Sequence, residues 1–348
     1  MRIIATSPVS GSRAGWNSRS WCTGCFPNRE VKEEARVSER QKVELAVVGA
    51  GPAGISAGIW ARRVGLSAVV IEAGEPGGQL RGVRGPIPDY PGWREVQGPE
   101  LARALVDHLL RSGTPLVDSA GPVRVDTAGR LVHTAAGEWE AEAIVLATGA
   151  RPRRLGIPGE AAMERRGEVW SASRDAGRFR HLPVVVIGGG DRALEGAWLL
   201  AEAGAQVTIV HRRTSFRARR EWRERVFRHP GITVMAPAWA VAIQGSDQTQ
   251  SVRIRLGGAG EIEVPAAGVF VRIGTEPNLE GIHGLPRLDS YGVVAVDRWG
   301  RTSLPGIYAA GDVCTPAPYT GVASAVADGM RAVKAAVQDM EGANPFKG

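Results

Sequence analysis

The sequence contains few cysteines, few aromatic residues and no long apolar run. Only three of its 348 residues are cysteines, too few for a disulfide framework, which favours a reducing compartment. No apolar run reaches the roughly 18 residues that a membrane helix needs. The first apolar stretch is too short and too polar for a secretion signal. These absences predict a cytoplasmic protein that does not enter a membrane.

Glycine, by contrast, is frequent. The chain has 46 glycines and 43% hydrophobic residues, which suit an α/β fold with many tight strand–helix turns. Its length predicts about two domains of roughly 100–200 residues each. The net charge of +7 is too mild to indicate a nucleic-acid partner and suits a protein that binds anionic cofactors. We expect no metal site.

The strongest motif lies in residues 43–74, which read VELAVVGAGPAGISAGIWARRVGLSAVVIEAG. The pattern predicts a strand, a glycine turn, a helix and a second strand. Gly49 allows the tight turn, Gly51 lets a pyrophosphate approach the backbone, and Gly54 lets the helix pack on the strand. Glu72, 18 residues after Gly54, can accept hydrogen bonds from a ribose. Together these features predict a dinucleotide site, with the phosphates at the helix N-terminus.

The same unit recurs in residues 182–213, LPVVVIGGGDRALEGAWLLAEAGAQVTIVHRR. Gly188 and Gly190 occupy the first two glycine positions, and Asp191 opens the helix. Ala193 occupies the third position, which the motif permits. A second dinucleotide site is therefore expected.

The second strand of this unit ends in basic residues, whereas the second strand of the first unit ends in an acidic residue. The chain continues with His211, Arg212, Arg213 and then Arg217, where a guanidinium group can bind a ribose 2′-phosphate. We therefore expect NADPH here in preference to NADH. The alternative, a solvated basic helix, is the expectation for the following arginines, Arg219, Arg223 and Arg225. Two such units in one chain predict a flavoprotein that takes hydride from a nicotinamide.

Residues 43–342 resemble the low-molecular-weight thioredoxin reductases and the related ferredoxin– or flavodoxin–NADP reductases. The resemblance is carried, in order along the chain, by the motifs GAGPAG (49–54), PGGQL (76–80), DYPGW (89–93), GPELARAL (98–105), ATGARPRRLGIPGE (147–160), GGGDRALEGA (188–197), HRRTSFRAR (211–219), IGTEPN (273–278) and GIYAAGDV (306–313).

This resemblance implies an α/β architecture of two Rossmann-like domains in a homodimer. The FAD domain would occupy residues 43–155 and 281–345, and the NADPH domain, residues 156–280, would be inserted in it. Residues 1–42, polar and without a clear period, would be a disordered or untranslated extension.

The resemblance also implies FAD contacts. The expected residues are Gly49, Gly51, Pro52, Ala53, Gly54, Glu72, Gly78, Gln79, Asp89, Thr148, Gly149, Gly311 and Asp312. Among these, Asp312 would bind the ribityl chain. The helix after it would direct its N-terminus at the flavin, where the dipole favours the anionic reduced ring.

The sequence departs from the family at the redox-active dithiol. The family has C-A-T-C-D between the two domains' glycine motifs, whereas residues 169–177 here read VWSASRDAG. Ser171 and Arg174 replace the two cysteines, while Ala172 and Asp175 remain. Neither replacement has redox chemistry, so the route through an internal disulfide would be absent.

A second departure follows the GDV motif. The family's Arg-Gln pair at the flavin is replaced by Thr320 and Gly321, and Tyr319 before them would stack near the ring or fill the core.

Cys314 would begin a helix, where a thiolate is stabilised, or would simply be a small buried residue.

Three functions remain open. The first is an NADPH-dependent FAD oxidoreductase that passes electrons directly to an external acceptor, such as ferredoxin, flavodoxin, a quinone, oxygen or a small disulfide. The second is a disulfide reductase that uses Cys22 and Cys25 of the sequence WCTGC. The third is a non-enzymatic flavin redox sensor.

Whether the natively expressed protein contains Cys22 and Cys25 shows where translation begins. Residues 32–34, Lys-Glu-Glu, can be encoded as AAG-GAG-GAG, a ribosome-binding sequence, a short distance before Val37, whose codon can serve as a start. We expect natively expressed protein to begin at Val37 and to contain one cysteine. Intact mass spectrometry measures this, and a species that retains Cys22 and Cys25 would contradict it.

Overall fold

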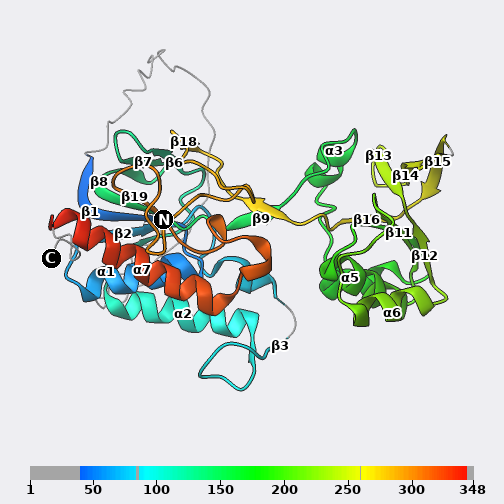
Figure 1. Cartoon of the computed structure of the whole chain (residues 1–348), viewed down its shortest axis with the longest axis horizontal. Coiled ribbons are helices and arrows are strands. Elements are labelled where there is room, and N and C mark those ends of the chain that lie inside the picture. The colour runs from blue at the N-terminus through cyan, green and yellow to red at the C-terminus, as the bar shows by residue number, and fades with distance from the viewer. Residues whose placement is uncertain (1–39, 84–85, 259, 343–348) are drawn as a thin grey trace, which may run out of the picture. The chain divides into compact units, whose positions relative to one another are not determined.

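The structure is a computed structural model that describes residues 40–83, 86–258 and 260–342. The expectations for residues 1–39, including those for Cys22 and Cys25, lie outside this part of the chain. Residues 40–152 and 275–342 form one α/β lobe, here called the first lobe, and residues 153–274 form the second lobe (Figure 1). The expected α/β class with parallel, Rossmann-like sheets is confirmed.

The first lobe contains an eight-stranded sheet in the order β18-β6-β7-β8-β1-β2-β5, with β19 paired to β8. The strands β5, β2, β1, β8 and β19 are parallel to their neighbours in this series. Their bounds are Gln41–Val48 (β1), Ala68–Ile71 (β2), Leu116–Val117 (β5), Gly137–Leu146 (β8) and Ile307–Ala309 (β19). Strand β1 begins two residues before the expected Val43 because it extends along β8, with Gln41 opposite Trp139.

The other edge of this sheet is an antiparallel meander. It consists of β6 (Arg124–Asp126), β7 (Leu131–Thr134) and the first half of β8, and β18 (Ile282–His283) pairs with β6 in parallel. A separate two-stranded ribbon is formed by β3 (Pro86–Ile87) and β4 (Val96–Gln97).

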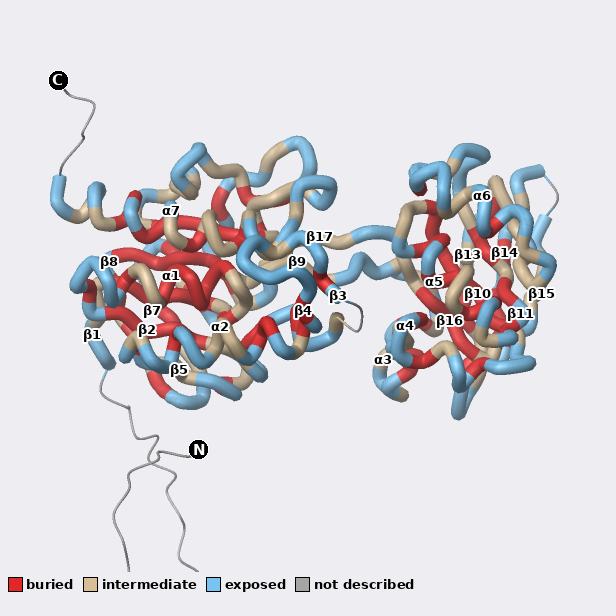
Figure 2. Tube along the Cα trace, turned by 90° about the horizontal axis from the view of Figure 1, so that it is seen from below, coloured by how far each residue is buried: buried red, intermediate tan, exposed pale blue. Residues whose placement is uncertain are grey.

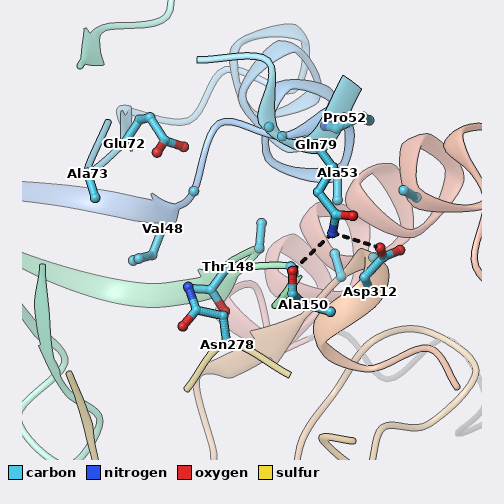
Figure 3. A pocket seen from close by; sticks show the side chains of 18 of the residues that line it. Val48, Pro52, Ala53, Glu72, Ala73, Gln79, Thr148, Ala150, Asn278 and Asp312 are labelled. Carbon is cyan, nitrogen blue, oxygen red and sulfur yellow. Dashed lines mark hydrogen bonds between the residues drawn. The ribbon is translucent and has the colours of Figure 1, made fainter. Parts of the chain in front are cut away.

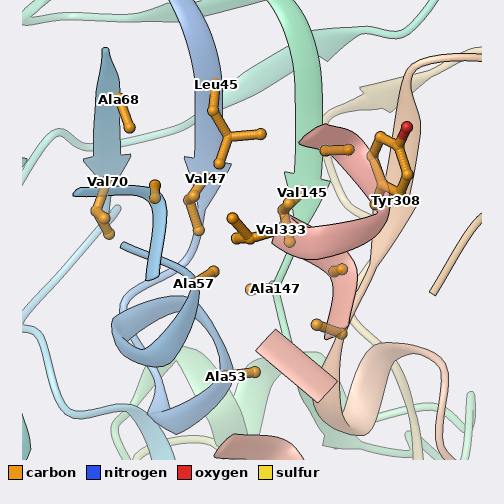
Figure 4. Close-up of a cluster of buried hydrophobic side chains, with 14 of the residues drawn as sticks. Leu45, Val47, Ala53, Ala57, Ala68, Val70, Val145, Ala147, Tyr308 and Val333 are labelled. Atoms are coloured by element: carbon orange, nitrogen blue, oxygen red, sulfur yellow. The ribbon is translucent and has the colours of Figure 1, made fainter. Parts of the chain in front are cut away.

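Three helices cover one face of this sheet: α1 (Pro52–Arg63), α2 (Gly98–Ser112) and α7 (Val322–Met340). Because successive side chains of a strand point to opposite faces, Leu45 and Val47 pack against α1 and α7, as Figure 4 shows. Ala46 and Val48 pack in a second cluster with residues of the meander. The central strands are consequently buried along most of their length (Figure 2).

The second lobe contains a parallel sheet of four strands in the order β12-β11-β10-β16. Their bounds are Pro183–Ile187 (β10), Gln206–Val210 (β11), Ile232–Met235 (β12) and Gly268–Val271 (β16). An antiparallel sheet follows β12, with strands Ala238–Gln244 (β13), Ser251–Leu256 (β14) and Gly260–Pro265 (β15). The helices are Glu160–Arg165 (α3), Ala172–Asp175 (α4), Asp191–Glu202 (α5) and Arg220–Arg228 (α6).

The chain passes between the lobes twice, and the two crossings pair with each other. Strand β9 (Ala150–Pro152) leads out of the first lobe, and β17 (Thr275–Pro277) leads back, antiparallel to it. The second lobe is therefore an insertion in the chain of the first lobe.

Helices α1 and α7 approach closely because small residues line their contact. A Cβ atom added at Gly329 of α7 would overlap the backbone carbonyl of Ala53 in α1. Ala53 and Ala57 on α1 and Ala325 and Ala332 on α7 belong to the same buried cluster. A larger side chain here would push the two helices apart.

We expect Gly329→Ala to destabilise the first lobe by about 1–3 kcal/mol, since the overlap is with rigid backbone. The roughly 1 kcal/mol that alanine gains in helix propensity over glycine does not offset it. Thermal unfolding measures the effect. Gly82→Ala is the matched control, because a Cβ atom at Gly82 meets nothing within 4 Å. A Gly329→Ala protein that melts at or above the wild-type temperature would contradict the packing.

Candidate cofactor sites and the Ser171 segment

The first glycine turn is closely packed between helix α1 and the end of strand β8. Gly49 has a φ of 104°, and its N–H donates to the Ile71 carbonyl over 2.7 Å. A Cβ atom at Gly49 would overlap the carbonyl of Ala147, and one at Gly54 would overlap the carbonyl of Gly49. Gly54 thus serves the close helix–strand packing that the motif predicts.

The turn borders a cavity of about 730 Å³ that is lined mainly by residues of the first lobe (Figure 3). The ends of β2 and β8, the short helix Gly78–Gly82, the Gly311 turn and the start of α7 also line it. Eleven of the residues expected to bind FAD line this cavity: Gly49, Gly51, Pro52, Ala53, Glu72, Gly78, Gln79, Thr148, Gly149, Gly311 and Asp312. Gly54 lies behind the turn, and the exposed Asp89 does not line the cavity.

Two glycines let the cavity wall be bare backbone. A Cβ atom at Gly78, whose φ is 58°, would lie 2.9 Å from the Cα atom of Gly51. Backbone at this position can contact a ligand without intervening side chains, as a pyrophosphate site requires.

Glu72 stabilises the turn as well as facing the cavity. Its Oε2 accepts the Ala50 N–H at 2.7 Å, and its Oε1 accepts the Gly74 N–H at 3.0 Å. Each carboxylate oxygen retains a further lone pair. The carboxylate at the end of β2 is therefore fixed in orientation and able to accept from ribose hydroxyls.

Gln79, Asp312 and Thr148 form the polar wall of the cavity. The Gln79 amide donates to the Ala150 carbonyl at 3.0 Å and to an Asp312 oxygen at 3.4 Å. Burial raises the pKa of Asp312; the positive charge of Arg192 opposes this effect, and the Asp328 carboxylate adds to it. Among the residues that the structure describes, the buried Thr148 hydroxyl has no hydrogen-bond partner.

These residues fit FAD. The cavity combines a bare backbone cradle, a fixed ribose acceptor, and a buried carboxyl and an unpaired hydroxyl that need polar partners. Asn278, which sequence analysis did not assign, also lines the cavity and donates its N–H to the Gly149 carbonyl at 2.9 Å. In the sequence, its position in the IGTEPN motif was the signal that could have placed Asn278 at this cavity.

For Cys314 and Tyr319, in the segment after Asp312, the structure excludes one of the two alternatives in each case. Cys314 ends a short 3₁₀ helix, Gly311–Val313, and α7 begins only at Val322, so Cys314 is not at a helix start. Burial raises the pKa of the Cys314 thiol to about 12, so its thiolate is disfavoured. Tyr319 is 69% exposed and does not fill the core. Thr320 and Gly321 themselves line the cavity.

The second glycine turn repeats the geometry of the first. Gly188 follows β10 with a φ of 147°, and a Cβ atom there would overlap the Arg272 carbonyl. Gly190 precedes α5, Asp191 is its first residue, and Ala193 is fully buried in its first turn.

The loop after β11 folds back over this turn. The His211 ring lies against Gly189, and its Nε2 is 3.0 Å from the Ser215 carbonyl oxygen. The Arg217 N–H donates to the Gly189 carbonyl at 3.0 Å. Burial lowers the pKa of His211, and the neighbouring arginines lower it further, so the ring is neutral at pH 7.

Arg212, Arg213 and Arg217 are exposed on this loop. Their guanidinium groups form no ion pair with any carboxylate of the described chain. They lie at the end of β11, where a Rossmann-like fold binds the adenosine ribose. The arrangement can bind a 2′-phosphate.

Of the three arginines expected on a solvated basic helix, Arg219 and Arg225 are exposed to solvent and Arg223 is not. Arg219 precedes α6, and its backbone N–H and its Nε donate to the carboxylate of Asp191, at 2.7 and 3.1 Å. Arg223 is half-buried. Arg225 is exposed, but its guanidinium lies over the rings of Trp198 and Trp222. Asp191 thereby ties the loop to the first turn of α5.

The segment at the expected dithiol position is held by a charge pair. Ser171 precedes α4, and its N–H donates to Asp175 Oδ2 at 2.9 Å. Arg174 donates to both oxygens of the buried Asp175, and its Nη2 also donates to the Val169 carbonyl at 3.0 Å. The Arg174 hydrogen bonds hold the pKa of Asp175 below its usual range. Asp175 is therefore ionised and committed to the local fold.

Within the described ranges, no group of histidine, cysteine or acidic side chains is placed to hold a metal ion. Nor does any helix in these ranges have the length and apolar character to cross a membrane.

Two glycine turns, each at the carboxyl edge of a parallel sheet, define the class of oxidoreductases with two dinucleotide folds. The chain belongs to the pyridine nucleotide-disulphide oxidoreductase family, which it matches over residues 43–339. It is a thioredoxin-reductase-like, FAD-dependent oxidoreductase.

Relatives and solved structures support this assignment. The thioredoxin reductase of Mycolicibacterium smegmatis is 37% identical over 280 residues, which are 78% of this chain and 88% of the relative. The structure of Lactococcus lactis thioredoxin reductase is 32% identical, with a TM-score of 0.74, and covers 86% of this chain and 99% of its own. The bacillithiol disulfide reductase of Staphylococcus aureus is 19% identical, with a TM-score of 0.71 over 86% of this chain and 99% of its own, and shares the fold.

We expect the Cys314 thiol to resist alkylation in the native state. A thiol with a pKa of about 12 is almost wholly protonated at pH 8, and only the thiolate is nucleophilic. In the Cys22→Ser/Cys25→Ser variant, iodoacetamide should react with native protein at least about a hundredfold more slowly than with protein in guanidinium chloride. A native rate–pH profile with a midpoint below pH 9 would contradict the burial of this thiol.

Proposed function

We propose that the protein is an NADPH-dependent FAD oxidoreductase that transfers electrons from flavin directly to an external acceptor. The observation that carries this proposal is the Ser171 segment. Residues 26–313 contain no cysteine, and Ser171 and Arg174 stand where the resemblance implies the dithiol. Neither side chain can take up or pass on an electron pair as a dithiol does.

The remaining cysteines support the same conclusion. Cys314 is a single thiol whose pKa is raised by burial, so it is not poised for exchange. Cys22 and Cys25 lie outside the described residues. If they are translated, they are the one pair that could form an internal disulfide.

The first lobe would hold FAD, which supplies hydride uptake and onward electron transfer when bound. Gly51 and Gly78 would admit its pyrophosphate to the backbone, and Glu72 would accept from its ribose hydroxyls. Asp312 and Thr148 would take hydroxyl partners from its ribityl chain. The N-terminus of α7, with Gly321 at its cap, would favour negative charge on the ring.

The second lobe would hold NADPH. Arg212, Arg213 and Arg217 would bind the 2′-phosphate in bidentate fashion, and β11 ends without an acid that would repel it. The neutral ring of His211, packed on Gly189, would keep these arginines near the glycine turn. This set of groups supports NADPH as the electron donor.

The acceptor would be a small electron-carrier protein or a small molecule such as a quinone. Thr320 and Gly321, which are small, line the cavity. We also propose a homodimer in the cytoplasm, as the resemblance implies. The names of the relatives support the second candidate, a disulfide reductase, which would require Cys22 and Cys25.

An acceptor panel under anaerobic conditions tests the proposal. The purified flavoprotein and its Cys22→Ser/Cys25→Ser variant are reduced with NADPH and offered thioredoxin, ferredoxin, flavodoxin and a quinone. We expect equal turnover by the two proteins with a carrier or a quinone, and little or none with thioredoxin.

Efficient thioredoxin reduction that is lost in the double variant would establish the disulfide reductase instead. Thioredoxin reduction that survives in the double variant would contradict the assignment of Ser171 and Arg174. Rapid flavin bleaching with no acceptor giving turnover would favour a redox sensor.

A further inference from the structure

The segment that joins the Gly311 turn to helix α7 carries no charge. Residues 313–327 include no acidic or basic side chain, although charged residues make up 23% of the chain. Residues 45–61 are also uncharged, but most of them are buried in the first glycine motif. The segment before α7 reaches the surface instead, and its exposed residues are Ala317, Pro318, Tyr319, Gly321 and Ala323.

This uncharged segment borders the cavity assigned to FAD. Thr320, Gly321 and Val322 line the cavity. Val322 and Val83 pack against the buried cluster that contains Leu80, and these three side chains all line the cavity. The edge of the cavity at the start of α7 is therefore mainly apolar, and the uncharged segment continues from this edge to the solvent.

Tyr319 has the largest side chain of the segment and is 69% exposed. It ends the short 3₁₀ helix Ala317–Tyr319, in which Pro318 fixes its own φ, as Pro316 does just before the helix. The Tyr319 N–H donates to the Pro316 carbonyl at 2.9 Å. Within the described part of the chain, the Tyr319 ring pairs with no other aromatic ring. A rigid turn thus holds an aromatic ring in water beside the cavity, as a preformed surface for stacking.

The chemistry of this surface distinguishes between the candidate acceptors. Carrier proteins are steered and oriented by opposite charge, which residues 313–327 do not supply. A neutral, planar molecule gains instead from apolar contact with Val83 and Val322 and from stacking on Tyr319. A quinone has this shape, and it accepts the two electrons that a reduced flavin delivers.

We propose that Tyr319, Thr320, Gly321 and Val322 form an acceptor site that binds a neutral, planar quinone. The site rests on the proposed function, because its electrons come from flavin, and it names the acceptor of that function. A hydride, which is one proton and two electrons, passes from the reduced flavin to the quinone, and solvent supplies the second proton. The balanced reaction converts NADPH, one proton and a quinone into NADP⁺ and a hydroquinone.

Binding and turnover are measured on the flavoprotein and three variants. The variants are Tyr319→Ala, Tyr319→Phe and the matched control Tyr291→Ala, since Tyr291 is 61% exposed and does not line the cavity. Equilibrium titration of the oxidised protein without NADPH gives the dissociation constant of 2-methyl-1,4-naphthoquinone. Steady-state kinetics then compare this quinone with ferricyanide, a charged acceptor that is not planar.

We expect Tyr319→Ala to raise the dissociation constant and the KM of the quinone by about three- to thirtyfold, because the stacking surface is removed. Tyr319→Phe keeps the ring and should stay within about twofold of the wild-type values. The ratio of kcat/KM for the quinone to kcat/KM for ferricyanide should fall in Tyr319→Ala alone. Tyr291→Ala should match the wild type in every measurement.

An unchanged quinone dissociation constant in Tyr319→Ala would overturn the inference, and this exposed side chain can be replaced without loss of the fold. Equal losses with the quinone and with ferricyanide would also overturn it, because they would place the Tyr319 ring against the flavin instead of the acceptor.

Two further outcomes separate the inference from the proposed function. A protein that reduces ferredoxin or flavodoxin but not the quinone would refute the inference and leave the proposed function intact. Quinone binding through Tyr319, in a protein that reduces only thioredoxin and only with Cys22 and Cys25, would refute the proposed function and leave the quinone site.

Discussion

The close packing of each glycine turn, against α1 in the first lobe and against the residue after β16 in the second, is the constraint on which the rest of the structure depends. Gly54 lets α1 pack against the carbonyl of Gly49, and Gly188 lets its turn pack against the carbonyl of Arg272. Each contact holds a helix N-terminus at the carboxyl edge of a parallel sheet. The cavity, the position of Glu72 and the arginine loop all follow from these contacts.

The fold and most of the FAD cavity could be predicted from the sequence, because both depend on glycine spacing and strand alternation. The sequence did not show that Arg219, just before α6, would bind Asp191, or that α7 would begin eight residues after Cys314. These features depend on contacts between segments distant in the chain, which local patterns do not encode.

The segment at the expected dithiol position stabilises the local structure through an ion pair. Arg174 and Asp175 form a pair that also binds Val169 and the Ser171 N–H, so the local turn is held by charge and hydrogen bonds. An ionised Asp175 bound to arginine is not available as a proton donor at neutral pH.

The stoichiometry of anaerobic NADPH titration tests the central claim most directly. A disulfide takes up two electrons in addition to those that the flavin takes up. The account predicts that about one equivalent of NADPH per FAD completes the reduction, with or without Cys22 and Cys25. A requirement for about two equivalents, falling to one in the Cys22→Ser/Cys25→Ser variant, would show a working disulfide and contradict direct transfer from flavin.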